Sequence, residues 1–204
     1  MDVVAVIDFE TTGLSPNEGA RATEVAAVIL KDGEVVDRYQ SLMNAGVRIP
    51  AFIESLTGIT NTMIRSAPPA AAVMREVASF VGDIPLVAHN AAFDSHFWDA
   101  ELDRIDQRRA QPFACSLLLS RRILPLAPSH KLGELVRFAN LPKAVRAHRA
   151  LADAEMAANL LLYLETQLCS RFNLPEVSYE LLRKIQSQPK AKLAQCVERH
   201  QQGR

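Results

Sequence analysis

The 204-residue sequence contains only three cysteines, Cys115, Cys169 and Cys196, and they are widely spaced and odd in number. This usage argues against a disulfide framework and against a zinc knuckle. No apolar run approaches the roughly 18 residues that a membrane-spanning helix needs. No basic leader precedes the apolar stretch near the N-terminus, as it would in a signal peptide. Repeats and low-complexity segments are also lacking. We therefore expect a globular, cytoplasmic protein that does not associate with membranes.

The sequence has no net charge, because 23 Lys and Arg residues balance 23 Asp and Glu residues. The balance hides an asymmetry, since residues 1–103 carry a net charge of −9 and residues 104–149 a net charge of +8. An acidic half followed by a basic block would place a cation site beside a surface that binds polyanions. The alternative is that these charges disperse over the folded surface. Charge alone leaves both interpretations open.

Hydrophobic patterns predict mostly strands first and mostly helices later. Val3–Phe9 is an apolar run, rich in β-branched residues, that is typical of a central strand covered on both faces. The predicted strands are 3–9, 22–30, 35–42 and 84–88, and the predicted helices are 49–56, 70–81, 91–105, 116–123, 131–140, 151–169, 177–185 and 191–200. This order indicates an α/β fold with a mixed sheet. We expect one domain over residues 1–170 and a short, basic helical extension over residues 171–204.

Two acidic residues lie at the end of the first predicted strand. Asp8 and Glu10 are two positions apart, so in an extended chain they point to the same face. Two carboxylates at the end of an apolar strand repel each other and raise each other's pKa. A hard divalent cation such as Mg²⁺ or Mn²⁺ removes this repulsion. Two solvated acids at the mouth of the strand are the alternative.

Two further segments place polar residues at the start of predicted helices. Asn90 and Asp94 lie where the strand 84–88 passes into a helix, and His148 and Asp153 precede or open the long helix 151–169. Each has an ordinary structural explanation, because Asn caps helices and acidic residues favour the first turn. The combination of four acids and one histidine, each at the edge of a core element, favours a functional site.

The three segments together resemble the signature motifs of the DEDDh 3′–5′ exonucleases. This DnaQ-like group includes the epsilon subunit of bacterial DNA polymerase III and ribonuclease T. The motifs here are Asp8-Phe9-Glu10-Thr11-Thr12-Gly13, His89-Asn90-Ala91-Ala92-Phe93-Asp94, and His148 with Asp153. The resemblance covers about residues 2–168. It implies a ribonuclease H-like fold, in which a five-stranded mixed sheet is flanked by helices.

The resemblance also implies a role for each residue that matches a motif. The acids that would hold two Mg²⁺ or Mn²⁺ ions and take part in catalysis are Asp8, Glu10, Asp94 and Asp153. His148 would be the general base, since a neutral imidazole takes up a proton near physiological pH. The residues that would bind substrate are Thr12, Leu14 and Asn90. For Leu14 the alternative is ordinary packing on the core. Basic candidates for phosphate contacts are Arg121, Arg122, Lys131, Arg146 and Arg149.

The implied function is removal of nucleoside monophosphates from single-stranded or frayed 3′ ends of DNA, in proofreading or in freestanding repair. Exonucleases that trim RNA share the same motifs, so the choice between DNA and RNA stays open. A non-catalytic module that binds nucleic acid or a polymerase is the third alternative. For residues 171–204 we leave open three roles: docking a polymerase subunit, forming a homodimer, or packing on the domain.

Overall fold

The computed structural model describes residues 2–143 and 148–203, and its strands form one mixed sheet in the order β3-β2-β1-β4-β5. The strands are β1 (Val4–Thr11), β2 (Ala22–Lys31), β3 (Glu34–Leu42), β4 (Leu86–Ala88) and β5 (Phe113–Cys115). β1 pairs with β2 and β2 with β3 in antiparallel orientation, whereas β4 is parallel to β1 and β5 is parallel to β4. This arrangement confirms the expected α/β fold with a five-stranded mixed sheet.

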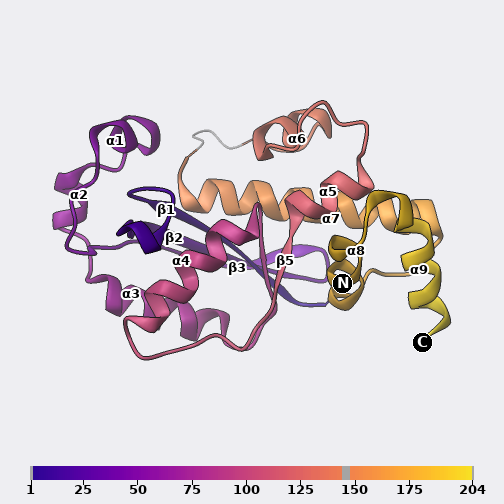
Figure 1. Ribbon diagram of the computed structural model, residues 1–204, viewed down its shortest axis with the longest axis horizontal. Helices are drawn as coiled ribbons and strands as arrows, with labels where there is room; N and C mark the ends of the chain where they lie inside the picture. The colour runs from indigo at the N-terminus through magenta and orange to yellow at the C-terminus, as the bar shows by residue number, and fades with distance from the viewer. Residues whose placement is uncertain (1, 144–147, 204) are drawn as a thin grey trace.

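Helices cover both faces of the sheet (Figure 1). They are α1 (Ala51–Thr57), α2 (Asn61–Arg65), α3 (Ala70–Val81), α4 (Ala91–Asp103), α5 (Ser116–Ile123), α6 (Leu132–Phe138), α7 (Ala150–Phe172), α8 (Tyr179–Ser187) and α9 (Leu193–Gln202), with 3-10 turns η1 (Pro16–Glu18) and η2 (Lys190–Lys192). α3 and α4 pack on one face, while α7, α5 and α8 pack on the other. Within the described residues, no helix is both long and apolar enough to span a membrane.

Side chains of β1 alternate between the two cores. Val4 and Val6 belong to the core beneath α7, whereas Ile7 belongs to the core beneath α3 and α4. Because residues two apart share a face, Asp8 and Glu10 continue the row of Val4 and Val6. The strand therefore carries both carboxylates toward the face that α7 covers.

Two short elements were not predicted from the sequence patterns. β5 has three residues and α2 has five, and neither is long enough to show a period of 2.0 or 3.6 residues. The other predicted segments agree with observed elements, and their bounds differ by no more than three residues. β1 continues two residues beyond the predicted end at Phe9, because Glu10 and Thr11 still pair with β2 across a register shift.

The C-terminal helices α8 and α9 are part of the main core. Leu182, Ile185 and Val197 are fully buried and join the cluster formed by α7 and the sheet. Figure 1 shows α8 and α9 at the end of the molecule where both termini lie, opposite α1 and α2. Of the three roles left open for the extension, the structure therefore shows packing on the domain.

α8 also covers the edge strand β5. The amide of Cys115 donates to Oε1 of Gln186 over 2.6 Å, and Nε2 of Gln186 donates to the carbonyl of Phe113 over 3.2 Å. The Tyr179 hydroxyl donates to the Leu86 carbonyl at 2.9 Å. An edge strand presents unpaired amides and carbonyls that invite aggregation unless they are covered. The extension thus completes the sheet at β5.

Removing residues 173–204 is expected to give a protein that aggregates. The deletion exposes the apolar faces of α7 and α5 and uncovers β5. Burial of the seven apolar side chains that α8, α9 and the preceding loop contribute to the core is worth roughly 10–20 kcal/mol in total at about 1.5–3 kcal/mol each, which is at least comparable to the whole stability of a domain. Size-exclusion chromatography and thermal unfolding would measure this, and a monomeric product with an unchanged melting temperature would contradict it.

Glu165 of α7 makes stability depend on pH. Its side chain is 9% exposed, and Oε1 has no hydrogen-bond partner among the described residues. Burial raises the pKa of Glu165 from 4.5 to about 8, and the carboxylate of Asp2 adds to this effect. Because the folded protein prefers the neutral acid, the contribution of Glu165 to stability falls as pH rises from 4.5 to 8.

Glu165→Gln is therefore expected to gain stability relative to wild type as pH rises. At pH 4.5 the side chain at this position is mostly neutral in the folded state of both proteins. At pH 8 the unfolded wild type is favoured by ionisation of Glu165, whereas burial opposes the same ionisation in the folded state. Each pKa unit is worth about 1.4 kcal/mol, so the difference should grow by about 2–5 kcal/mol across this range. Urea unfolding of both proteins at both pH values measures the change in their stability difference. Any cost of burying the amide is the same at both pH values and therefore cancels. A pH-independent difference would contradict it.

Candidate functional site

The ends of β1 and α4 bring three predicted acids together. Asp8 and Glu10 are partly buried near the end of β1, and Asp94 is 2% exposed in the first turn of α4. The backbone amide of Phe9 donates to Oδ1 of Asp94 over 3.2 Å. This bond ties the residue between the two β1 acids to the first turn of α4. β4 delivers α4 to this position because it runs parallel to β1.

α7 adds the fourth acid and the histidine. Asp153 lies in the first turn of α7, and His148 precedes the helix with an exposed side chain. Glu10, His148 and Asp153 each offer one ligand atom, and these atoms lie within 4.8 Å of one another. Residues separated by more than 130 positions in the sequence thus meet at one end of the sheet.

Burial raises the pKa values of all four acids, and repulsion from neighbouring carboxylates adds to the shift at Asp8, Glu10 and Asp153. Burial is the largest cause at Asp8, and the carboxylates of Asp94 and Asp153 raise its pKa further. Burial raises the pKa of Glu10 to about 8 and that of Asp94 to about 8. For Asp153 burial also raises the pKa, and His148 partly offsets the shift. Without a positive charge between them, the four carboxylates are costly in this position.

The residues present fit divalent cations. Oδ1 of Asp153 is buried and accepts no hydrogen bond from any described residue, which is costly unless another partner is bound. The four acids supply the carboxylate oxygens that Mg²⁺ and Mn²⁺ prefer. An orphaned carboxylate oxygen beside three raised carboxyl pKa values is the electrostatic signature expected of a cation site.

The three predicted substrate-binding residues are placed differently. Leu14 is 84% exposed, so it is not packed on the core. Asn90 is exposed at the N-cap of α4 with φ of 71°, and its side chain makes no capping hydrogen bond. Asn is tolerated in this left-handed region better than most residues. Thr12 is partly buried, and both its amide and its hydroxyl bond to the backbone of Arg21. Their contacts with substrate stay predictions.

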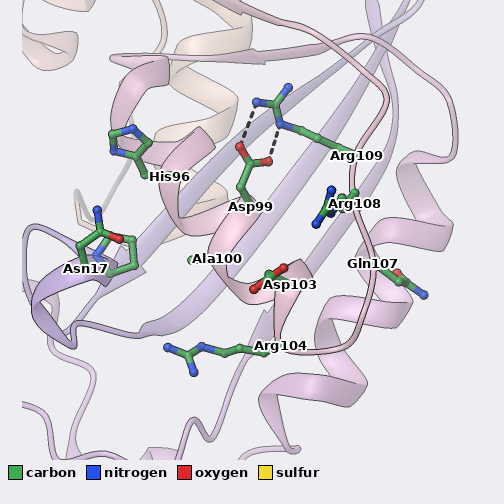
Figure 2. A pocket seen from close by; sticks show the side chains of 10 residues that line it. Asn17, His96, Asp99, Ala100, Asp103, Arg104, Gln107, Arg108 and Arg109 are labelled. Atoms are coloured by element: carbon green, nitrogen blue, oxygen red, sulfur yellow. Dashed lines mark hydrogen bonds and ion pairs between the residues drawn. The ribbon is translucent and has the colours of Figure 1, made fainter.

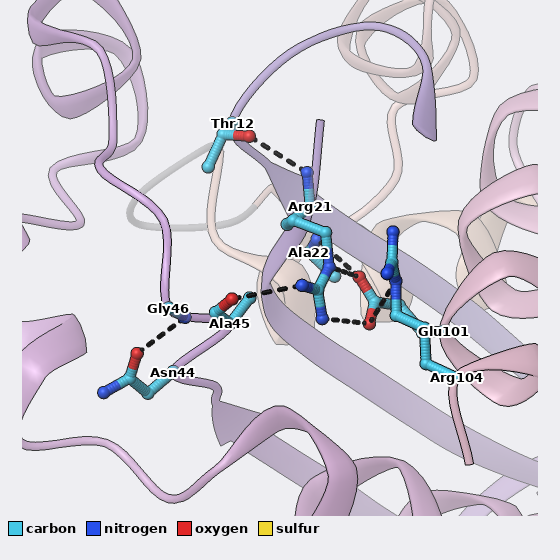
Figure 3. Close-up of polar contacts among 8 residues, drawn as sticks. All are labelled: Thr12, Arg21, Ala22, Asn44, Ala45, Gly46, Glu101 and Arg104. Carbon is cyan, nitrogen blue, oxygen red and sulfur yellow. Dashed lines mark hydrogen bonds and ion pairs between the residues drawn. The ribbon is translucent and has the colours of Figure 1, made fainter. Parts of the chain in front are cut away.

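A buried ion pair fixes the loop that follows β1 (Figure 3). Nε and Nη2 of Arg21 donate to the two carboxylate oxygens of Glu101 at 2.7 and 2.8 Å, and Nη1 donates to the Ala45 carbonyl at 3.1 Å. Glu101 is 2% exposed. The backbone amide of Arg21 donates to the Thr12 hydroxyl at 3.0 Å. The pair therefore joins α4 and β2 to the loop that presents Leu14.

A cavity of about 490 Å³ lies beside Asn90 and is partly basic. Its lining includes Arg121 and Lys131, together with His89 and His130. His89 bonds through Nδ1 to the Ser116 hydroxyl at 2.9 Å and through Nε2 to the His130 carbonyl at 3.0 Å. Burial lowers the pKa of His89 to about 4, so this imidazole is neutral and fixes the cavity wall. The positive charge comes from Arg121 and Lys131.

The other residues predicted to contact phosphates either bond to groups of the protein or lie outside the described residues. Arg122 donates to the backbone carbonyls of Gln188 and Leu118, both at 2.8 Å. Arg146 lies outside the described residues. Arg149 pairs with Glu24, a contact that the sequence did not predict. The only signal for Glu24 was a single charged residue inside the mostly apolar predicted strand 22–30.

A larger cavity, of about 720 Å³, is separate from these acids (Figure 2). Asp99 of α4 and Arg109 stand at its rim and pair over 2.6 Å. Its other lining residues are Pro16, Asn17, His96, Ala100, Asp103, Arg104, Gln107 and Arg108. None of these lining residues belongs to the three motifs, so size does not identify the functional site here.

Comparisons with known proteins agree with the geometry. The sequence model described as Exonuclease matches residues 5–161. The chain is 37% identical over 171 residues to a DNA polymerase III of PolC type from Oceanobacillus iheyensis, a match that covers 83% of this chain and 12% of the relative. It is 38% identical over 164 residues to the 3′–5′ exonuclease DinG of Bacillus subtilis, and this match covers 78% of this chain and 17% of the relative.

A solved structure of exonuclease X in complex with 5′-overhanging duplex DNA shares the fold. Its TM-score is 0.70 at 24% sequence identity, and the match covers 90% of this chain and 99% of that one. The chain thus spans less than a fifth of the two curated relatives, but nearly the whole length of this structural neighbour.

Proposed function

The chain belongs to the exonuclease family, within its DEDDh 3′–5′ group. From this premise we propose that it hydrolyses phosphodiester bonds and so releases nucleoside monophosphates from the 3′ ends of DNA. One observation carries the proposal: four carboxylates and a histidine meet at the ends of β1, α4 and α7. The mutual electrostatic cost of these acids has a ready explanation if they hold cations that hydrolysis requires.

Each residue of the site has a part in this reaction. Asp8, Glu10 and Asp153 would hold one divalent cation, and Asp8 with Asp94 would hold the second. Two such ions, Mg²⁺ or Mn²⁺, would supply Lewis acidity and charge neutralisation for phosphodiester cleavage. His148 would take the proton from the attacking water as the water oxygen bonds to phosphorus. The bond from phosphorus to the preceding 3′ oxygen breaks, and that oxygen keeps the electron pair and takes a proton from solvent to become the new 3′ hydroxyl.

The remaining contacts support a single strand of any sequence. Arg121 and Lys131 line the cavity beside Asn90, where they would bind phosphates without reading bases. Leu14 is exposed and would pack against the terminal base. The polymerase among the relatives and the DNA-bound structural neighbour favour DNA as the substrate. RNA remains the alternative, since discrimination depends on contacts with the 2′-hydroxyl.

We place the catalytic unit in residues 1–170, with residues 171–204 packed on it. Proofreading beside a DNA polymerase and freestanding repair both fit this unit, and the polymerase subunit, the homodimer and the cytoplasmic location stay predictions. The apolar face of the extension is buried against the domain and therefore cannot dock a partner. A partner would have to bind the exposed surface.

Degradation of matched 5′-labelled DNA and RNA oligonucleotides tests the proposal. The assay compares Mg²⁺, Mn²⁺ and chelator, and includes Asp8→Asn as the inactive reference. A metal-dependent ladder that shortens from the 3′ end, faster on DNA, is the expected result. A faster ladder on RNA would replace DNA with RNA as the substrate. A folded wild type that produces no ladder would favour the non-catalytic binding module.

A further inference from the structure

Glu24 of β2 is a fully buried carboxylate with a complete set of partners. Its exposure is 0%. Nε of Arg149 lies 3.0 and 3.2 Å from its two oxygens, and Nη2 of Arg149 donates to Oε1 at 2.6 Å. The backbone amide of Ala150 donates to Oε2 at 3.0 Å, and Nε2 of Gln40 donates to Oε1 at 2.7 Å. One side chain therefore ties together β2, β3 and the start of α7.

This carboxylate acts as the N-terminal cap of α7, although it comes from another element. Arg149 stands at the N-cap position, and its own side chain makes no capping bond. Ala150 is the first residue of the helix, and its amide is one of those left unpaired at any helix start. A negative charge is also favoured at this end of a helix. Glu24 thus fixes where α7 begins.

The same contact lies between two parts of the candidate site. Glu24 is the cross-strand partner of Glu10, so both side chains share one face of the sheet. Arg149 is sequence neighbour to His148, whose φ of 59° lies in the left-handed region. Residues other than Gly are uncommon in that region, although Asn, Asp and His adopt it more readily than the rest. His148 therefore has an uncommon backbone conformation immediately before an anchored residue.

We propose that Glu24 and Arg149 are positioning residues for the hydrolytic reaction. The buried Glu24 carboxylate holds Arg149 and the Ala150 amide, and this anchor sets where His148 and Asp153 stand relative to Glu10. The inference rests on the proposed exonuclease function. It gives Arg149 a structural role that the phosphate-contact prediction did not include, because two guanidinium nitrogens bind a buried carboxylate that balances its charge.

Two variants remove the anchor in different ways. Arg149→Met keeps most of the apolar stem of the side chain without its charge, and Glu24→Gln keeps the size of the carboxylate. A displacement of about 1 Å at a reacting group can cost 10²-fold in rate, so we expect kcat to fall about 10- to 100-fold and KM to change less than about threefold. Arg149→Lys keeps the charge but not the forked geometry, so its kcat should lie between that of wild type and Arg149→Met.

Arg38→Met is the matched control. Arg38 of β3 pairs with Glu155 of α7 at 2.6 Å, so it also joins the sheet to this helix. Its side chain is 49% exposed, and loss of an exposed pair has little effect. The control should keep kcat and KM within about twofold of wild type. Circular dichroism and the melting temperature confirm that each variant is folded at the assay temperature.

A double-variant cycle with His148→Ala separates positioning from substrate contact. If Arg149 acts by placing His148, Arg149→Met should lower kcat less in the His148→Ala background than in wild type. Equal losses in both backgrounds, a rise in KM at unchanged kcat, or unchanged kinetics in folded Arg149→Met and Glu24→Gln would each overturn the inference. An inactive wild type in the same assay would instead refute the proposed function, and this inference with it.

Discussion

Asp8→Asn is expected to abolish hydrolysis while it stabilises the protein in the absence of divalent cations. The activity falls because Asp8 is the acid that, in the proposed mechanism, would hold both cations, and loss of several kcal/mol of transition-state stabilisation corresponds to about 10³-fold in kcat. The stability rises because burial, and then the carboxylates of Asp94, Asp153 and Glu10, oppose ionisation of Asp8. Removing one charge from this cluster relieves the repulsion that remains.

Thermal unfolding with chelator and with Mg²⁺ measures the second effect without any nuclease assay. At a pH above 8, where Glu10 and Asp94 are largely ionised, wild type should melt lower than Asp8→Asn in chelator. Added Mg²⁺ should raise the melting temperature of wild type more than that of the variant. Asp99→Asn is the control, since Asp99 lies on the same helix as Asp94 but pairs with Arg109 outside the cluster.

A wild type whose melting temperature does not respond to Mg²⁺ or Mn²⁺ would contradict cation binding by these acids. If Asp8→Asn melted lower than wild type in chelator, the acids would be stabilised by contacts other than bound ions. The two outcomes are independent of substrate, so they remain informative even if the preferred polymer is RNA.

His148→Ala is expected to lower kcat by about 10²- to 10⁴-fold, the range for loss of a general acid–base group. The rate falls because no other imidazole among the described residues joins the acids of the candidate site. The Mg²⁺-dependent rise in melting temperature should persist, because four carboxylates remain. His96→Ala is the matched control, since His96 is exposed at the separate larger cavity and should leave kcat within about twofold of wild type.

The thermal measurement decides between two roles for His148. Its ring nitrogen lies within 4.8 Å of ligand atoms of Glu10 and Asp153, so the geometry also permits metal ligation. If His148→Ala lost the Mg²⁺-dependent stabilisation along with activity, His148 would be a ligand rather than a base. Unchanged kcat would exclude both roles.

Most long elements could be predicted from the sequence because their signals are local. Asp32-Gly33 marks the hairpin between β2 and β3, and Pro69 and Gly82 flank α3 at its observed ends. The apolar run of β1 predicts a strand that is buried on both faces, as the two cores confirm. β5 could not be predicted in this way, because three residues acquire their strand geometry only by pairing with β4 and contacting α8.

The sequence by itself determined which groups could do chemistry and on which elements they lie. The period of two in β1 put Asp8 and Glu10 on one face, and the helix starts located Asp94 and Asp153. Tertiary structure alone decided which of the charged groups pair with each other within the fold. Glu24 and Arg149 are 125 residues apart, and no local pattern shows that their charges cancel. The same holds for the extension, whose apolar helix faces in α8 and α9 find their partner only in the folded domain. Local periodicity fixes directions along one element, whereas pairing between charges and between apolar faces depends on how distant elements come together.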